Sequence, residues 1–161
     1  MIRLIGILLV LSSSVLLGRV YTAESERRVL ELSALIDFLR YAKDRVNCYL
    51  EPLAAIAEGY TDTVLERSGF LGELREGRVL SVAFGSASDK LSLPEDTKGV
   101  VLSALSSLDG SYKDGLVSGL DLLISSLNGI YATLERETRG RARVVRITAI
   151  SAGLGLSIML L

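Results

Sequence analysis

Two charge-free segments, one near each end, constrain the fold of this chain most. Residues 4–18 (LIGILLVLSSSVLLG) and 147–161 (ITAISAGLGLSIMLL) contain no Asp, Glu, Lys or Arg. A 15-residue helix is only ~22 Å long, so each segment needs flanking residues to cross a hydrocarbon core of ~30 Å. Arg3 and Arg19 can snorkel to the interface, and Val144 and Val145 extend the second segment. We therefore predict transmembrane segments over residues 1–20 and 144–161, with a soluble domain over residues 21–143.

Alternatives exist at both ends. Arg3 followed by an apolar run also fits a cleaved secretory signal, although Tyr21 in Tyr21-Thr22-Ala23 is bulky where cleavage requires a small residue. No Cys follows the run, which excludes a lipoprotein signal. The second segment could be a buried soluble helix, but it is apolar on every face. We favour two retained membrane anchors, and a secreted or surface-anchored helical binding module with a cleaved signal is the alternative.

Arginines gather on the inner side of both segments. Eight flank the intervening domain, and only Arg3 lies beyond it: Arg19, Arg27, Arg28, Arg136, Arg139, Arg141, Arg143 and Arg146. By the positive-inside rule this asymmetry predicts a cytoplasmic domain. The expected membrane-flanking residues are Arg3, Arg19, Arg139, Arg141, Arg143 and Arg146. Nucleic-acid binding is the competing explanation, but the net charge is −1 and attraction to anionic headgroups accounts for the cluster.

Two apolar stripes predict long helices in the intervening domain. The first alternates steps of three and four: Val29, Leu32, Leu35, Leu39, Ala42, Val46, Tyr49 and Leu53. The second has heptad spacing: Leu116, Leu120, Leu123, Leu127, Ile130 and Leu134. We predict an all-α helical bundle whose two long antiparallel helices run into the N- and C-terminal transmembrane segments. The expected helix-packing residues are Leu32, Leu35, Leu39 and Val46 with all six of the second stripe.

The second stripe also allows a coiled coil between two copies of the chain. Packing within one chain is favoured, because three heptads can close on the first stripe and free dimers usually sustain longer repeats. Gly115 and Gly119 lie one turn apart on this segment, a spacing that permits close approach of helices.

Turn and capping residues divide the part between the long helices. Pro52 begins a short helix that Gly59 ends, and Thr61 is the expected N-cap of a second short helix ending at Gly69. Residues 70–84 fit either a helix or an irregular segment, and residues 85–89 (GSASD) are expected to form a loop.

A further helix is expected after this loop. Ser92 and Glu95 have capping-box spacing before a helix that ends at Leu108, with Val101, Leu102 and Leu105 directed inward. The Asp109-Gly110-Ser111 sequence then predicts a turn before the last helix.

The composition argues against enzyme chemistry. The chain has no His and one Cys, which excludes a Ser-His-Asp triad, a Cys-His dyad, a His-bearing metal site and an intrachain disulfide. No Walker A, GxGxxG or HExxH pattern is present. Cys48 lies beside the first stripe, where we expect a buried or half-buried, inert thiol. We predict no catalytic residue, no metal site, no cofactor and a non-enzymatic function.

The ends of the chain resemble the stage III sporulation protein AB family of endospore-forming bacteria. The resemblance begins with Arg3, Leu4-Ile5-Gly6 and Gly18, and continues with a Leu-rich helix after Arg27 and Arg28. It includes the Pro52-Leu53-Ala54-Ala55 stretch and the terminal run Ala152-Gly153-Leu154-Gly155-Leu156 through Met159-Leu160-Leu161.

This resemblance implies a non-enzymatic scaffold in the channel that links mother cell and forespore. The family is similar to the inner-membrane platform protein of type II secretion and type IV pilus systems. The implied partners are other sporulation-channel membrane proteins and the cognate cytosolic ATPase, with a possible homo-oligomer and no nucleic acid. The implied location is the mother-cell membrane, with the helical domain facing the cytoplasm.

Overall fold

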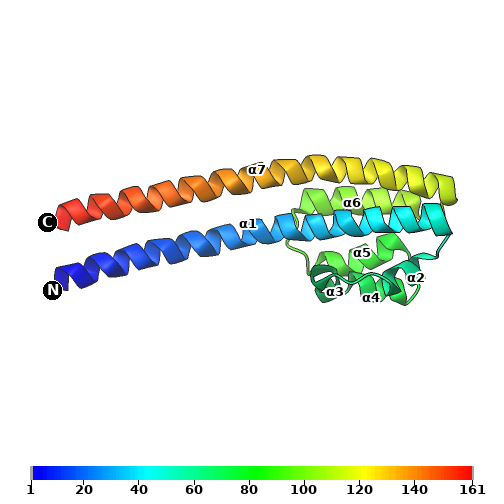
Figure 1. Cartoon of the computed structure of the whole chain (residues 1–161), viewed down its shortest axis with the longest axis horizontal. Coiled ribbons are helices and arrows are strands. Elements are labelled where there is room, and N and C mark those ends of the chain that lie inside the picture. Colours follow the sequence, from blue (N-terminus) through cyan, green and yellow to red (C-terminus); the bar gives the residue numbers. More distant parts are fainter. Residues whose placement is uncertain (1, 161) are drawn as a thin grey trace. The chain divides into compact units, whose positions relative to one another are not determined.

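The computed structural model describes the backbone of residues 2–160 and the side chains of residues 23–140, 144, 147 and 151. Over this part the chain forms seven helices and no strand, which confirms the all-α fold class (Figure 1). The helices are α1 (Ile2–Tyr49), α2 (Leu53–Glu58), α3 (Thr63–Ser68), α4 (Phe70–Arg75), α5 (Leu80–Ser88), α6 (Glu95–Leu108) and α7 (Lys113–Leu160).

The chain divides into two compact units. The bundle unit comprises Arg28–Ala132, and the terminal unit comprises Met1–Arg27 with Thr133–Leu161. The predicted transmembrane segments, residues 1–20 and 144–161, belong to the terminal unit, and nearly all of their side chains lie outside the described residues. Val144 and Ile147 are described, and both are exposed.

Within the bundle unit, α1 and α7 run antiparallel. Arg40 Nη2 on α1 donates a hydrogen bond of 3.0 Å to Asn128 Oδ1 on α7, and Lys43 Nζ lies 2.8 Å from Asp121 Oδ1. The partners on α7 fall in number as those on α1 rise, which fixes the direction.

The predicted packing residues differ in how far their side chains are buried. Seven are buried: Leu32, Leu35, Leu39, Val46, Leu120, Leu123 and Leu127. Leu116, Ile130 and Leu134 are half-buried. Since a single chain buries the three central leucines of the heptad stripe, that stripe packs within the chain.

An aromatic cluster joins α1 to the short helices. The Phe38 ring meets Phe70 of α4 edge-on at 5.2 Å and Tyr60 at 5.3 Å, and Phe70 meets Phe84 of α5 at 6.4 Å. All three phenylalanines are buried. Such pairs add about 0.5–1.5 kcal/mol beyond their area burial, so short helices that would be unstable alone are held against α1.

Side-chain hydrogen bonds tie the connecting segments to the bundle. Arg75 donates to the carbonyl oxygens of Ala57 and Tyr60, at 3.0 and 3.1 Å, and to the Glu66 carboxylate at 2.9 Å. The buried Glu31 carboxylate of α1 accepts the Ser92 backbone N–H at 2.5 Å.

Several local predictions were wrong for identifiable reasons. Asp62, rather than Thr61, caps α3, because its Oδ1 accepts from both the Val64 and Leu65 N–H groups at 2.9 Å. The expected capping box does not form, because Ser92 bonds Glu31 through its backbone and Pro94 precedes the helix without a side-chain cap.

Residues expected to form a loop at 85–89 instead complete α5 as far as Ser88. Leu80, Ala83, Phe84 and Ala87 recur at helical spacing and are all buried, so packing outweighs the weak helix propensity of Gly85.

Three side chains expected to lie inside are exposed. Cys48 is an exposed thiol, Tyr49 is 66% exposed at the last position of α1, and Leu102 is 40% exposed on α6. The bundle covers α1 along one stripe only, and Tyr49 lies beyond its last buried residue, Val46. The Tyr49 ring instead faces the Arg45 guanidinium, 5.3 Å from its centroid.

Candidate interaction surface between α6 and α7

One exposed face of α7 in the bundle unit is mostly uncharged, with Asp114 and Asp121 at its edge. Its residues recur mostly in steps of three and four, and all are exposed: Gly115, Ser118, Leu122, Ser125, Ser126, Gly129 and Ala132. Leu122 is the one large side chain among them and is 74% exposed. We call these residues the outward face of α7.

This face explains a feature of the hydropathy profile. Among the residues that the structure describes, Lys113–Gly140 is long and apolar enough to cross a membrane, with a mean hydropathy of 1.2 and 22% of its window buried. In the bundle unit, however, Asp121 and Asn128 of this stretch bond to α1. The high hydropathy thus combines a buried packing stripe with an uncharged outward face.

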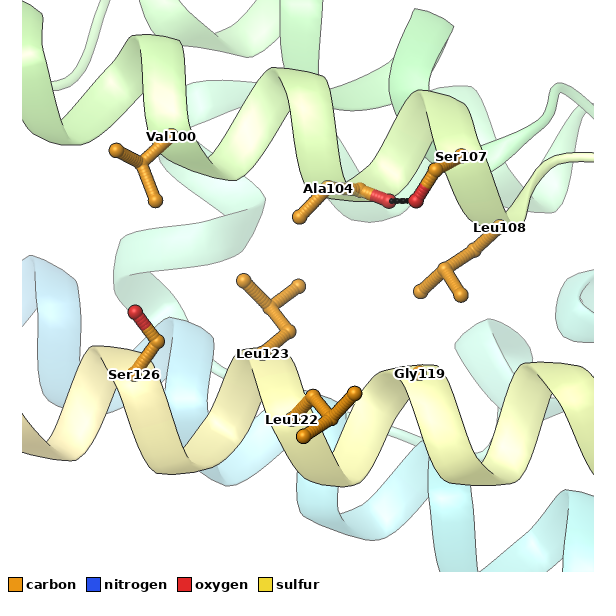
Figure 2. Close-up of a pocket in the computed structure, with 8 residues that line it drawn as sticks. All are labelled: Val100, Ala104, Ser107, Leu108, Gly119, Leu122, Leu123 and Ser126. Atoms are coloured by element: carbon orange, nitrogen blue, oxygen red, sulfur yellow. Dashed lines mark hydrogen bonds between the residues drawn. The ribbon is translucent and has the colours of Figure 1, made fainter.

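A groove separates α6 from the outward face of α7. It has a volume of about 240 Å³. Val100, Ala104 and Leu108 line it from α6, and Gly119, Leu122 and Leu123 from α7 (Figure 2). Figure 2 shows Val100, Ala104 and Leu108 directed from α6 toward α7. Leu123 points from α7 into the space between the helices, and Leu122 lies across the α7 ribbon.

The close approach of two residues limits the groove on one side. A β-carbon built on Gly119 would overlap Leu108 Cδ2 and lie 3.3 Å from Leu108 Cγ. The glycine therefore lets the end of α6 approach α7, and the predicted Gly115/Gly119 pair acts within the chain at Gly119. At Gly115 an added β-carbon would meet Ser111 at ordinary distances.

Two serines, Ser107 and Ser126, line the groove. Ser107 donates its hydroxyl hydrogen to the Ala104 carbonyl oxygen of its own helix at 2.7 Å. Because this donor is already used, covering Ser107 with a partner would not leave it unsatisfied.

Acidic side chains outnumber basic ones on the two helices that form this uncharged groove. The α6–α7 hairpin, residues 94–132, contains five Asp or Glu and two Lys, a net charge of −3. Lys98 is paired with Glu95 at 2.9 Å. Asp96 and Asp114 are exposed and have no ion pair among the described residues. Asp96 lies one turn before Val100, and Asp114 lies at the start of α7.

The shifted pKa values lie away from the groove, on and beside α1. The hydrogen bond that Lys43 donates to Asp121 raises the pKa of Lys43, and the smaller effect of desolvation lowers it. Contact with Tyr41 raises the pKa of Arg45, whose guanidinium lies 5.2 Å from that ring. Burial raises the pKa of Tyr60, and the nearby Asp62 and Asp37 add to the effect. These shifts describe packing contacts and place no proton-transfer group at the groove.

Of the six predicted membrane-flanking arginines, Arg139 is the one whose side chain the structure describes. Arg139 is exposed and pairs with Glu135 at 2.7 Å, an i, i+4 pair of the kind expected on a solvated helix face. The side chains of Arg3, Arg19, Arg141, Arg143 and Arg146 lie outside the described residues. Within the part that is described, no three Cys, Asp or Glu side chains are grouped to hold a metal ion.

Sequence reasoning missed the groove. The signal was present in the steps between Gly115, Leu122 and Gly129, which form a second stripe beside the heptad leucines. That stripe is composed of small residues, and only the position of α6 shows that it borders a hollow.

Comparison with known proteins gives one match. The family model described as stage III sporulation protein AB matches residues 3–161, essentially the whole chain. No curated protein and no solved structure matches significantly.

Proposed function

Because the chain belongs to the stage III sporulation protein AB family and so has a role in stage III of sporulation, we propose that it acts there as a membrane-anchored, non-enzymatic scaffold. The bundle unit is the part that docks partners. The cognate cytosolic ATPase and other membrane proteins of a type II secretion-like channel are the partners we propose, on the family resemblance.

The observation that supports docking is the uncharged groove on an otherwise charged bundle. The bundle unit, residues 28–132, carries fifteen acidic and ten basic side chains, yet residues 122–132 of α7 include none of them. Exposed apolar surface rimmed by polar residues is typical of protein interaction sites. A scaffold needs such a surface and no reacting group.

The charge distribution supports anchoring at a membrane. Outside the bundle unit the chain carries eight arginines and four glutamates, a net charge of +4, against −5 for the bundle unit. The positive residues flank the two charge-free segments, as expected where a chain meets anionic headgroups. We propose the mother-cell membrane as the location, with the bundle unit in the cytoplasm.

The native thiol tests this orientation. Cys48 is exposed and is the only cysteine, so a membrane-impermeant maleimide reports on the side of the membrane without further engineering. We expect no labelling in intact sporulating cells and labelling after permeabilisation, with Cys48→Ser as the blank. Labelling of intact cells would contradict the cytoplasmic scaffold and support the secreted alternative.

A genetic test addresses the role itself. A strain that lacks the chain should stop at stage III and recover with the full-length protein. Sporulation at the normal level without the chain, under conditions that require the stage III channel, would contradict the proposal.

A further inference from the structure

The size of the α6–α7 groove limits which kinds of molecule can bind in it. Its volume of about 240 Å³ is below the ~300–1,000 Å³ typical of small-molecule sites. It lies between two helices, from Val100 to Leu108 on α6 and from Gly119 to Ser126 on α7. An apolar surface that follows two helices over about two turns suits the apolar side of a further helix.

The chemistry of the groove floor favours a close, dry contact. Leu122 is 74% exposed and Val100 43% exposed, so apolar area remains to be buried. The Ser107 hydroxyl hydrogen at the groove is bonded to the Ala104 carbonyl oxygen within α6. Covering Ser107 therefore costs little desolvation, because the donor keeps its partner.

The negative charge of the α6–α7 hairpin favours some binding partners over others. A second copy would bring two surfaces of net charge −3 together, and like charges across an interface oppose association. Anionic lipid headgroups would be repelled for the same reason. A helix whose apolar side is flanked by Lys or Arg would instead find Asp96 and Asp114 exposed and without ion pairs in the described part of the chain.

We propose, on the basis of the scaffold function above, that the α6–α7 groove binds a basic amphipathic helix of a partner protein. Leu122 is the central anchor, and Asp96 and Asp114 orient the basic flanks. Apolar contact supplies affinity, and the acidic rim speeds encounter and selects the partner.

A binding experiment with synthetic probes tests the chemistry. The probes are two 20-residue helical peptides with the same Leu/Ala stripe, one flanked by Lys and the other by Glu, titrated against the full chain in nanodiscs. We expect the Lys peptide to bind at least tenfold more tightly and to weaken as salt rises. Leu122→Asp should reduce its affinity at least tenfold, and Asp96→Lys with Asp114→Lys should remove the preference for Lys. Equal binding of the two peptides would overturn the proposal.

A matched control separates the groove from general surface effects. Val82 is an exposed apolar residue on α5, 45% exposed and absent from the groove lining. Val82→Asp should leave peptide affinity unchanged. If it weakens binding as much as Leu122→Asp does, the groove is not the site. Circular dichroism of each variant shows that the fold is retained.

Photo-crosslinking in sporulating cells tests the native occupant. With a benzoylphenylalanine at position 122, we expect an adduct that maps to a helical segment of net positive charge in another protein. An adduct with a second copy or with lipid, or no adduct at all, would overturn the proposal. Those outcomes leave the scaffold function standing if the strain still needs the chain to pass stage III and Cys48 is labelled only after permeabilisation.

Discussion

Gly119 on α7 lies against Leu108 at the end of α6, so close that a β-carbon on the glycine would overlap the leucine Cδ2 atom. This contact sets the approach of the two helices that form the groove. Leu108 is buried and lines the groove, so relieving the overlap would turn its side chain out of its packed position and into the groove.

Gly119→Ala is therefore expected to destabilise the bundle unit although alanine is the better helix former. Overpacking costs about 1–3 kcal/mol, and the gain in helix propensity returns about 0.5–1 kcal/mol. The net loss of up to about 2.5 kcal/mol should appear as a lower Tm of the full chain in detergent. Gly99→Ala on α6 is the control, since nothing lies within 4 Å of an added β-carbon there, and it should raise the Tm.

A double-mutant cycle identifies the cause. In a Leu108→Ala background the overlapping atoms are gone, so adding Gly119→Ala should cost nothing or stabilise. An equal loss in both backgrounds would show that Leu108 is not the residue that resists the added methyl group.

The N-cap of α3 gives a second prediction. Asp62→Ala removes the acceptor of two backbone N–H groups and should cost about 0.5–2 kcal/mol. Thr61→Ala, at the neighbouring exposed position, should change the unfolding free energy by less than about 0.5 kcal/mol. Denaturant unfolding of both variants measures the two losses. Equal losses in unfolding free energy would show that Asp62 is not the N-cap of α3.

The capping example shows what the sequence could and could not predict. Thr61 and Asp62 are both good N-cap residues, and the choice depends on the backbone turn rather than on residue type. The long helices and their stripes were predictable, because an apolar stripe that repeats over many turns is buried most favourably when the whole segment is one helix with that stripe packed inside. Residues 85–88 joined α5 because Phe84 and Ala87 pack inside, a tertiary effect that outweighs local loop signals.

The groove was harder to predict from the sequence than the helices were. Leu122 is one of many leucines in α7, and its 74% exposure follows from where α6 ends and how closely Gly119 admits Leu108. Those are relations between helices that a single periodicity cannot specify. Ser92 illustrates the same limit, since its expected capping bond gave way to Glu31, 61 residues earlier.

The aromatic cluster predicts the most damaging core substitution. Phe70→Ala should cost about 3–5 kcal/mol, because it leaves a cavity between Phe38 and Phe84. That is a large share of the ~5–15 kcal/mol typical of a folded domain, so partial unfolding is expected at 37 °C. Phe70→Leu, which refills most of the space, should retain the fold with a lower Tm. A Tm for Phe70→Ala equal to that of the unsubstituted chain would contradict the assigned core.

The left-handed backbone at Leu50 predicts a stabilising substitution. Leu50 has φ +56° directly after α1 and is 68% exposed, so its side chain loses steric freedom and gains little burial. Asn enters this region readily, and Leu50→Asn should stabilise by about 0.5–1 kcal/mol. Leu50→Ala keeps the β-carbon clash and should not stabilise. If the Tm falls with both Asn and Ala, Leu50 makes contacts that outweigh its strain.

Tyr60 predicts how stability responds to alkaline pH. Burial first, and then the charges of Asp62 and Asp37, raise its pKa above the ordinary value of 10.0. A folded-state pKa above that of the unfolded chain means that the native state holds the phenolic proton more tightly. The contribution is complete below pH 10.0 and is lost as pH rises through the folded-state value. The raised pKa of Lys43 acts in the same direction, from its ordinary value of 10.5 upward.

We therefore expect the unfolding free energy to decline above about pH 10 and the decline to become shallower in Tyr60→Phe, which has no proton to lose. Urea unfolding between pH 8 and 11 measures both slopes, with Tyr112→Phe as the control because Tyr112 is 93% exposed. Identical slopes in Tyr60→Phe and the unsubstituted chain would show that the phenol titrates alike in the folded and unfolded states.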